Sequence, residues 1–362
     1  MARGPTPMVQ GPTFETYYDS RECFDGYFRS HARQMGMKAS TLTGLRAWAT
    51  AARKKLIDLL GLKRMRPTSP RPRMTESVDC GDYIREHWLM QTQRDVTLPF
   101  YLLRPKGVSG PLPAVICPHG HGGGGKAAVA GVRDNPAVAK AIEEYNYDYG
   151  VQFARAGMLA FCPDARGFGE RQEREARSDV TAGSCHMLQL MGGPLGIAVA
   201  GMWTFDLMRL MDHIQQRRDV LGGRVGCAGL SGGGLQTLYF AAADTRVACA
   251  VISGYFYGAR ESLLQMPGNC DCNMIPQMWE NFDQGDVGAM IAPRPLLIET
   301  GDADTLNGAS GVANVVLQVK IARKAYNLLK AAGRLRHDIF AGPHMWHGTE
   351  AVGWMKKWLS GR

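Results

Sequence analysis

The chain has 362 residues, of which 45% are hydrophobic and 21% are charged, a composition typical of a folded globular enzyme. Its formal net charge of +9 arises within residues 1–74, which hold 14 Lys and Arg against 5 Asp and Glu, while the remainder is balanced. No run approaches the roughly 18 apolar residues of a membrane-spanning helix. No helix-turn-helix, zinc-finger or RNA-binding pattern accompanies the basic region. We therefore expect neither a membrane protein nor a nucleic-acid-binding protein.

The basic N-terminal region predicts a helical extension. Residues 1–13 are rich in Pro and Gly, and apolar residues recur at helical spacing between residues 20 and 62. Residues 64–73 contain three prolines and predict a linker. We therefore divide the chain into a basic helical extension with its linker, residues 1–75, and a catalytic domain, residues 76–362. The helices of the extension are the candidate surface for a homo-oligomer.

Short apolar runs alternate with longer helical runs through the rest of the chain. The first two runs predict an antiparallel pair at a sheet edge, and the later ones predict a mostly parallel sheet flanked by helices, which is an α/β fold. Two stretches interrupt the alternation, residues 171–196 and 255–290, and we expect both to shape a cleft. The predicted strands are 83–91, 96–103, 114–117, 158–163, 224–230, 247–253, 295–300 and 335–340; the predicted helices are 137–155, 197–217, 235–243, 312–332 and 349–359.

A Gly-x-Ser-x-Gly pentapeptide at residues 229–233 lies between a predicted strand and a predicted helix. This context is typical of a nucleophile elbow, in which the serine occupies a sharp, strained turn and its neighbours must be small. Ser231 is therefore the predicted nucleophile. The backbone NH of Gly232, directly after it, is the predicted first donor of an oxyanion hole.

A serine nucleophile needs a basic histidine and an acid that orients it, and in this architecture the chain order is nucleophile, acid, histidine. After the last predicted strand a Gly-Pro turn leads to His344, the preferred base, with His347 as the alternative. After the preceding strand, Asp304 lies three residues beyond a turn glycine and is the preferred acid. Asp302 and Glu299 remain alternatives for that role.

The glycine-rich loop 119–125 follows the first predicted parallel strand. It predicts the second oxyanion donor, the backbone NH of His121 or of Gly122. Arg166 and Trp279 are candidates for substrate contacts, although we expect the charged residues of the segment around Arg166 mainly to brace neighbouring loops. Further aromatic and methionine side chains that we expect near a pocket are Met187, Met191, Tyr255, Phe256, Tyr257 and Met278.

Nine cysteines, an odd number, argue against a disulfide framework. Residues 1–20 contain no apolar segment of the secretory type, so reduced thiols in a cytoplasmic protein are the expectation. Cys270 and Cys272 form a Cys-x-Cys pair, and His119 and His121 a His-x-His pair, but neither has a second pair at zinc-site spacing. We therefore expect no metal and no organic cofactor.

The chain resembles the α/β-hydrolase superfamily, and within it the dienelactone-hydrolase-like and acetyl-xylan-esterase-like enzymes. The resemblance covers roughly residue 43 to the C-terminus and rests on LRAWATAARKKLIDLLGL, PAVICPHGHGGGG, PDARGFGER, GLSGGG, IAPRPLLIETGDAD and FAGPHMWHG. It implies a helix-flanked, mostly parallel sheet and a triad of Ser231, Asp304 and His344. Two departures concern residues 305–308, where members usually have an apolar residue and proline, and Ser231 itself, where dienelactone hydrolases carry cysteine.

These observations together predict a serine carboxylesterase. The triad would act through an acyl-enzyme, and the resemblance implies a small-molecule or carbohydrate ester with a short acyl group of the acetyl type. A peptidase or amidase could use the same triad. A carbon–carbon bond hydrolase on the same fold is the other alternative, and a binding protein on an inactive hydrolase scaffold would normally lack a triad member.

Overall fold

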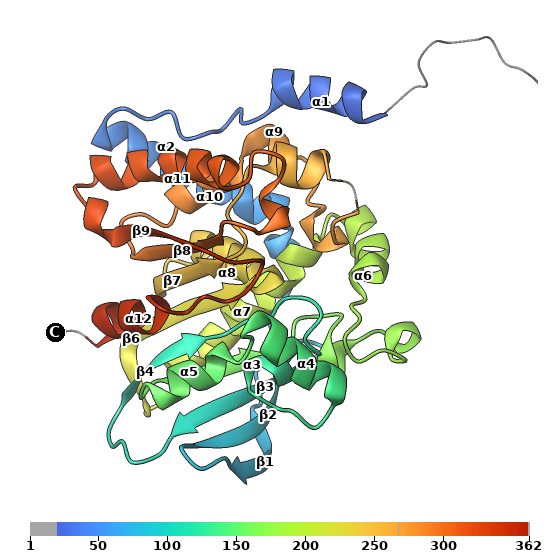
Figure 1. The fold of residues 1–362 in the computed structure, drawn as a ribbon, viewed down its shortest axis with the longest axis vertical. Coiled ribbons are helices and arrows are strands. Elements are labelled where there is room, and N and C mark those ends of the chain that lie inside the picture. Colours follow the sequence, from blue (N-terminus) through green and yellow to red (C-terminus); the bar gives the residue numbers. More distant parts are fainter. Residues whose placement is uncertain (1–19, 267, 361–362) are drawn as a thin grey trace, which may run out of the picture.

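Nine strands form one mixed sheet through the centre of the protein (Figure 1). The computed structural model describes residues 20–266 and 268–360. The strands are ordered β1-β2-β3-β5-β4-β6-β7-β8-β9 across the sheet. Their bounds are β1 Arg73–Asp79, β2 Tyr83–Gln93, β3 Val96–Pro105, β4 Leu112–Ile116, β5 Leu159–Pro163, β6 Val220–Leu230, β7 Val247–Ser253, β8 Leu296–Gly301 and β9 Leu335–Phe340.

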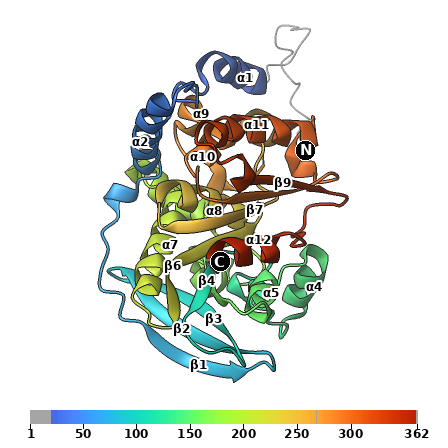
Figure 2. The ribbon, with the colours of Figure 1, turned by 90° about the vertical axis from the view of Figure 1, so that its left-hand side faces the viewer.

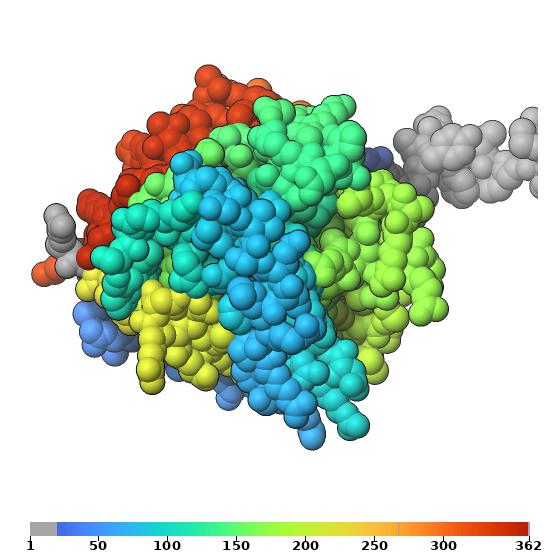
Figure 3. All heavy atoms as spheres, turned by 90° about the horizontal axis from the view of Figure 1, so that it is seen from below, coloured from blue at the N-terminus to red at the C-terminus, as the bar shows by residue number. Residues whose placement is uncertain are grey.

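Strands β4 to β9 are mutually parallel, whereas β1, β2 and β3 form an antiparallel ribbon that joins the sheet through β5. This ribbon, blue to cyan, crosses the face shown in Figure 3. The carboxyl ends of the parallel strands meet at one edge of the sheet, where α/β proteins bind their ligands.

Helices cover both faces of the sheet (Figure 2). Alternate residues of β4 belong to two separate hydrophobic cores: Ala114 and Ile116 pack with α7 and α8, and Val115 with α5 and α12. The α/β-hydrolase type of fold expected from the sequence is thereby confirmed. The helices are α1 Ser20–His31, α2 Leu42–Leu59, α3 Lys126–Val129, α4 Pro136–Tyr145, α5 Tyr149–Arg155, α6 Cys185–Gly192, α7 Val199–Gln215, α8 Gly232–Ala243, α9 Met278–Asn281, α10 Gln284–Ala289, α11 Val312–Leu328 and α12 Ala351–Leu359.

Two of the differences from the predicted elements have a clear physical reason. Strand β1 begins at Arg73, the end of the predicted linker, and was missed because six of its seven residues are exposed and show no apolar alternation. The predicted helix 137–155 is two helices, α4 and α5. The chain turns between them at Asn146, whose φ of 49° lies in the left-handed region that asparagine tolerates.

No single helix in the described part of the chain is long and apolar enough to cross a membrane. A bent pair, Cys185–Leu195 with Val199–Gln215, has sufficient length and composition but turns by 91° at its break. Most of α7, the second member of the pair, is buried in the core.

Helix α2 packs into the same core as the sheet. Ala52 and Leu56 are fully buried there, and Arg53 donates hydrogen bonds of 2.8 Å to the backbone carbonyls of Ala242 and Met290. The chain then runs along the outside of the molecule to β1 (Figure 2). The boundary between residues 75 and 76 stays a prediction, but α2 shares its buried contacts with the catalytic domain.

This packing predicts that α2 unfolds together with the sheet. Leu56→Ala should lower the free energy of unfolding by roughly 2–5 kcal/mol, because it leaves a cavity in a closed core. Leu42→Ala, on an exposed position of the same helix, should change it by less than about 0.5 kcal/mol. Urea unfolding followed by circular dichroism checks both. An unchanged midpoint for Leu56→Ala would mean that the helices fold as a separate unit.

Candidate active site

Ser231 lies at the junction between β6 and α8 with a φ of 59° and a ψ of −121°, a strained conformation for a residue with a side chain. Its backbone NH donates to the carbonyl of Ser253 at 2.9 Å. The flanking glycines are required by close packing. A Cβ at Gly229 would lie 2.5 Å from the backbone of Gly233, and one at Gly233 would lie 2.1 Å from the carbonyl oxygen of Pro118. The pentapeptide therefore forms the strand–turn–helix that the sequence predicts.

His344 and Asp304 form a hydrogen-bonded pair. His344 Nδ1 lies 2.7 Å from Asp304 Oδ2, and the Asp304 side chain is only 1% exposed. The other carboxylate oxygen accepts from the NH of Leu306 at 2.9 Å. A carboxylate at Nδ1 makes that nitrogen the donor, so Nε2 of the neutral ring is an acceptor.

The imidazole of His344 lies next to the elbow. A Cβ placed on Gly254 would lie 2.8 Å from His344 Cε1 and 3.2 Å from Leu230 Cδ1. Gly254 directly follows Ser253, whose carbonyl binds the NH of Ser231. The structure thus brings the preferred acid, the preferred base and the serine to the same edge of the sheet.

The alternative residues have other partners. His347 Nδ1 lies 2.7 Å from Asp338 Oδ2, and the His347 ring stacks on Phe340 at 4.3 Å between ring centroids. Asp302 accepts from the NH of Gly342 at 2.9 Å. Glu299 is buried and accepts from a backbone NH at 3.0 Å. Sequence reasoning did not identify Asp338 as the partner of the second histidine, because no motif surrounds it.

The loop 119–125 packs directly against Ser231. A Cβ on Gly120 would lie 3.0 Å from Ser231 Cβ, and one on Gly232 would lie 2.9 Å from His121 Nδ1. His119 fastens the loop: its Nε2 accepts from the NH of Ala165 at 3.0 Å, and its Nδ1 donates to the adjacent carbonyl at 2.7 Å. Burial lowers the pKa of His119 and keeps the ring neutral. The roles of Gly232, His121 and Gly122 as oxyanion donors stay predictions.

A cavity of about 220 Å³ opens at Ser231. Tyr255 and Tyr257, expected from the sequence to lie near a pocket, line it together with Leu306 of the loop after Asp304. Sequence reasoning missed two polar residues of the lining, Asn269 and Asn273, whose only signal was their position in the interruption after β7. The remaining lining residues are His121, Gly232, Leu235, Gly268, Cys270 and Cys272.

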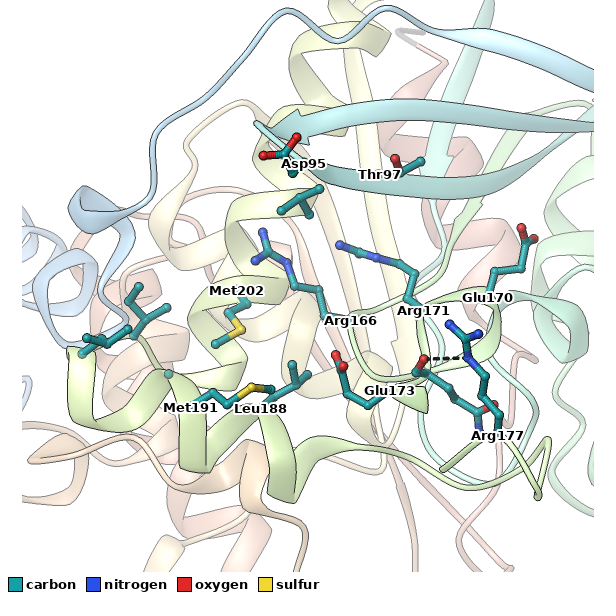
Figure 4. Close-up of a pocket in the computed structure, with 15 residues that line it drawn as sticks. Asp95, Thr97, Arg166, Glu170, Arg171, Glu173, Arg177, Leu188, Met191 and Met202 are labelled. Atoms are coloured by element: carbon teal, nitrogen blue, oxygen red, sulfur yellow. Dashed lines mark hydrogen bonds between the residues drawn. The ribbon is translucent and has the colours of Figure 1, made fainter. Parts of the chain in front are cut away.

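Arg166 does not line this cavity, contrary to the substrate contact expected for it. Its guanidinium donates two hydrogen bonds of 2.8 Å to Asp206 and one of 2.7 Å to Gln93. Figure 4 shows Arg166 beside Arg171 in a separate cavity of about 570 Å³. Burial raises the pKa of Asp206, but Arg171 and Arg166 outweigh this effect and lower it. Arg166 therefore braces loops, the role expected for its segment as a whole.

Trp279 also lies away from the serine. It packs on Phe28 of α1 at 6.2 Å between ring centroids and lines two other hollows, formed with α1 and with Tyr239. The segment after α1 holds α9 in this place, because the backbone NH groups of residues 33–35 donate to the carbonyls of residues 279–281. Neither Trp279 nor Arg166 is among the described residues that line the Ser231 cavity.

Comparison with known proteins agrees with this architecture. A model of the Abhydrolase family matches residues 37–308, which is most of the chain. The chain belongs to the Abhydrolase family. Among curated proteins, YtaP of Bacillus subtilis (strain 168), named as a candidate hydrolase, is 29% identical to this Abhydrolase over 325 residues, covering 85% of this chain and 98% of that protein.

Solved structures share the fold at low sequence identity. A candidate acetyl xylan esterase from Bacteroides fragilis NCTC 9343 has a TM-score of 0.74 at 18% identity, covering 90% of this Abhydrolase and 83% of that chain. A glucuronoyl esterase from Solibacter usitatus has a TM-score of 0.64 at 16% identity, and the match covers 90% of this chain and 96% of that chain. Both likenesses concern the fold.

Glu299 of this Abhydrolase generates a pH-dependent contribution to stability. Burial at the end of β8 raises its pKa from 4.5 to about 7. Between these two values the folded chain holds a proton that the unfolded chain has lost. Folding stability therefore falls as the pH rises through this window.

Glu299→Gln should remove this dependence, because an amide carbonyl keeps the acceptor for the NH of Gly348 without a charge. Between about pH 4.5 and pH 7.5 the free energy of unfolding of the variant should rise, relative to that of wild type, by on the order of 3 kcal/mol. Denaturant unfolding at several pH values checks this. Asp302→Asn, which neutralises an exposed carboxylate after the same strand, serves as the control. Its free energy of unfolding should follow the same pH dependence as that of wild type. If Glu299→Gln also follows the wild-type pH dependence, Glu299 is not the source of the effect.

Proposed function

We propose that this Abhydrolase is a serine carboxylesterase acting on short-acyl esters of carbohydrates. The observation that carries the proposal is the His344–Asp304 pair, 2.7 Å long and buried on its acid side, lying over Gly254 beside the strained Ser231. A histidine that is held by a buried carboxylate next to an elbow serine is the arrangement that activates a hydroxyl.

In the acylation step, Ser231 Oγ attacks the ester carbonyl carbon while His344 Nε2 takes the hydroxyl proton. Asp304 keeps the ring in the tautomer that can accept it and stabilises the imidazolium. The tetrahedral oxyanion receives hydrogen bonds from the NH of Gly232 and from the loop at His121. The imidazolium then gives its proton to the leaving alcohol oxygen, and the acyl group stays on Ser231.

In the deacylation step a water molecule takes the place of the alcohol. His344 removes its proton as it attacks the acyl carbonyl, and the same proton returns to Ser231 Oγ when the ester bond to the enzyme breaks. The two steps together consume one ester and one water, release the acid and the alcohol, and return Ser231 and His344 to their starting states.

The size of the cavity supports a short acyl group. A volume of about 220 Å³ corresponds to roughly seven water molecules, which suits an acetyl group with part of an alcohol better than a long acyl chain. Tyr255 and Tyr257 lie in the lining, almost completely buried, and form a closed wall on that side of the cavity. The names of the two esterases with this fold, which refer to acetyl xylan and glucuronoyl esters, both point to carbohydrate esters.

The proposed triad predicts unequal roles for two similar histidines. Ser231→Ala and His344→Ala should each lower kcat on p-nitrophenyl acetate by about 10³-fold or more. His347→Ala, which removes a histidine paired to aspartate at the same 2.7 Å, should keep kcat within about tenfold of wild type. Steady-state kinetics on folded variants check this, and equal losses at both histidines would refute the assignment of the base.

The substrate class predicts a graded response to acyl length. Rates should fall from p-nitrophenyl acetate to butyrate to octanoate, because the longer chains exceed the cavity. Acetate release from acetylated xylo-oligosaccharides should exceed alcohol release from a glucuronate methyl ester, since the small acyl side suits acetyl. Amide or β-diketone cleavage by folded wild type, without ester cleavage, would instead indicate a peptidase or a carbon–carbon bond hydrolase.

A further inference from the structure

Four potential metal ligands converge beside the Ser231 cavity. His121 comes from the loop after β4, Cys185 from the first residue of α6, and Cys270 and Cys272 from the segment after β7. Their ligand atoms all lie within 4.8 Å of one another. His121 Nε2 lies 3.9 Å from Cys185 Sγ and 3.8 Å from Cys272 Sγ.

We propose that these four side chains bind a zinc-type divalent cation in a closed tetrahedral site. Zinc is bound tetrahedrally by three cysteines and one histidine in structural sites, with Zn–S bonds of about 2.3 Å and Zn–N bonds of about 2.0–2.1 Å. Such bonds place neighbouring ligand atoms roughly 3.5–3.8 Å apart. The observed separations of 3.8 and 3.9 Å lie within about 0.4 Å of this range, and the upper limit of 4.8 Å for the whole set means that no pair needs to contract by more than about 1.3 Å.

The charge of the ligand set suits a divalent cation. Zinc binds cysteine as the thiolate, so a bound Zn²⁺ would displace the protons of the three thiols to solvent. The three thiolates would balance the two positive charges with one negative charge in excess.

A disulfide explains the cluster less well than a metal. It would join two of the three sulfurs and leave the third, together with His121 Nε2, without a shared partner. All nine cysteines of the protein are free in this structure. A soft divalent cation uses all four groups at once, because thiolates and imidazole are the ligands that zinc prefers.

The surroundings resemble those of a supported metal site. Asn273 Nδ2 lies 3.8 Å from Cys272 Sγ, where it can donate to a thiolate, and donates to the carbonyl of Cys270 at 3.1 Å. Tyr255 OH in turn donates to Asn273 Oδ1 at 2.6 Å. The edge of Phe168 packs on His121 at 5.0 Å between ring centroids. Such outer contacts orient ligands and exclude water around metals.

The site would join three segments that frame the cavity. Ligation through Nε2 leaves the proton on Nδ1 of His121, the nitrogen nearest Gly232. The cation would thereby hold the loop 119–125 against the elbow and tie it to α6 and to residues 270–272. This site stands independently of the esterase proposal, because its ligands do not include the triad. It replaces the expectation of no metal, which considered only ligand spacing along the chain.

Metal content of the reduced full-length protein tests the proposal. Chain stripped with a chelator, reloaded with Zn²⁺ and desalted should retain about one zinc per chain by mass spectrometry. Co²⁺ in place of zinc should give thiolate-to-cobalt charge transfer and the visible bands of a tetrahedral ion. Cys272→Ser should reduce zinc retention at least tenfold. Cys185→Ser should have the same effect, and it serves as the test variant when Cys272→Ser folds poorly. Ser231→Ala should retain zinc as wild type does, whether or not ester hydrolysis is found.

Cys227→Ser provides the matched control. Cys227 is an equally buried thiol, 3.4 Å from Thr237 Oγ1, so a serine can keep its polar contact. This variant should bind one zinc and give the cobalt spectrum. Wild type that retains no zinc and gives no cobalt spectrum while its thiols titrate as reduced would overturn the proposal. A disulfide among Cys185, Cys270 and Cys272 in freshly purified protein, found by peptide mapping, would overturn it as well.

Discussion

The close approach of the loop after β4 to the serine turn is the constraint on which the candidate site depends. The carbonyl of Pro118 lies where a Cβ of Gly233 would be, and Tyr149 OH donates to the same carbonyl at 2.6 Å. Gln236, one turn into α8, donates to the carbonyl of His119 at 2.8 Å. These contacts hold the loop after β4 against the Ser231 turn, and the two segments can approach this closely because Gly233 has no side chain between them.

The parallel topology explains why Asp304 and His344 meet beside that turn. Each strand from β7 to β9 ends at the same edge, so residues about 40 apart in the chain, Asp304 and His344, become neighbours. A second histidine–aspartate pair of the same 2.7 Å length, His347 with Asp338, has a local origin, because Asp338 lies within β9 and His347 on the loop that follows it. The surroundings distinguish the two pairs, because only the ring of His344 packs over Gly254 beside the elbow.

The residues that follow strand ends were predictable from the sequence, whereas contacts between interruptions were not. Ser231, Asp304 and His344 stand at fixed places in an alternating pattern, and that pattern also predicted the sheet and the antiparallel pair β2 and β3 at its edge, although not β1. Arg166 was a candidate for a substrate contact because it follows a strand near the expected cleft, yet its guanidinium donates to a buried carboxylate of α7, Asp206. The pairing of Cys185 with residues 270–272 was equally invisible, since it depends on how two irregular segments fold against each other and neither has a period.

The glycine-rich loop 119–125 needs the contacts that hold it in place. A glycine-rich loop loses much conformational entropy on folding, and oxyanion donors act only when they are held before the charge develops. Buried Lys126, at its end, donates from its backbone NH and from Nζ to Asp164, each at 2.7 Å, and also contacts Glu170. Burial would raise the pKa of Glu170, but His87 and Lys126 lower it to about 2. A buried ion pair adds little net stability, since its desolvation offsets its attraction, so the contribution of this network is to the position of the loop.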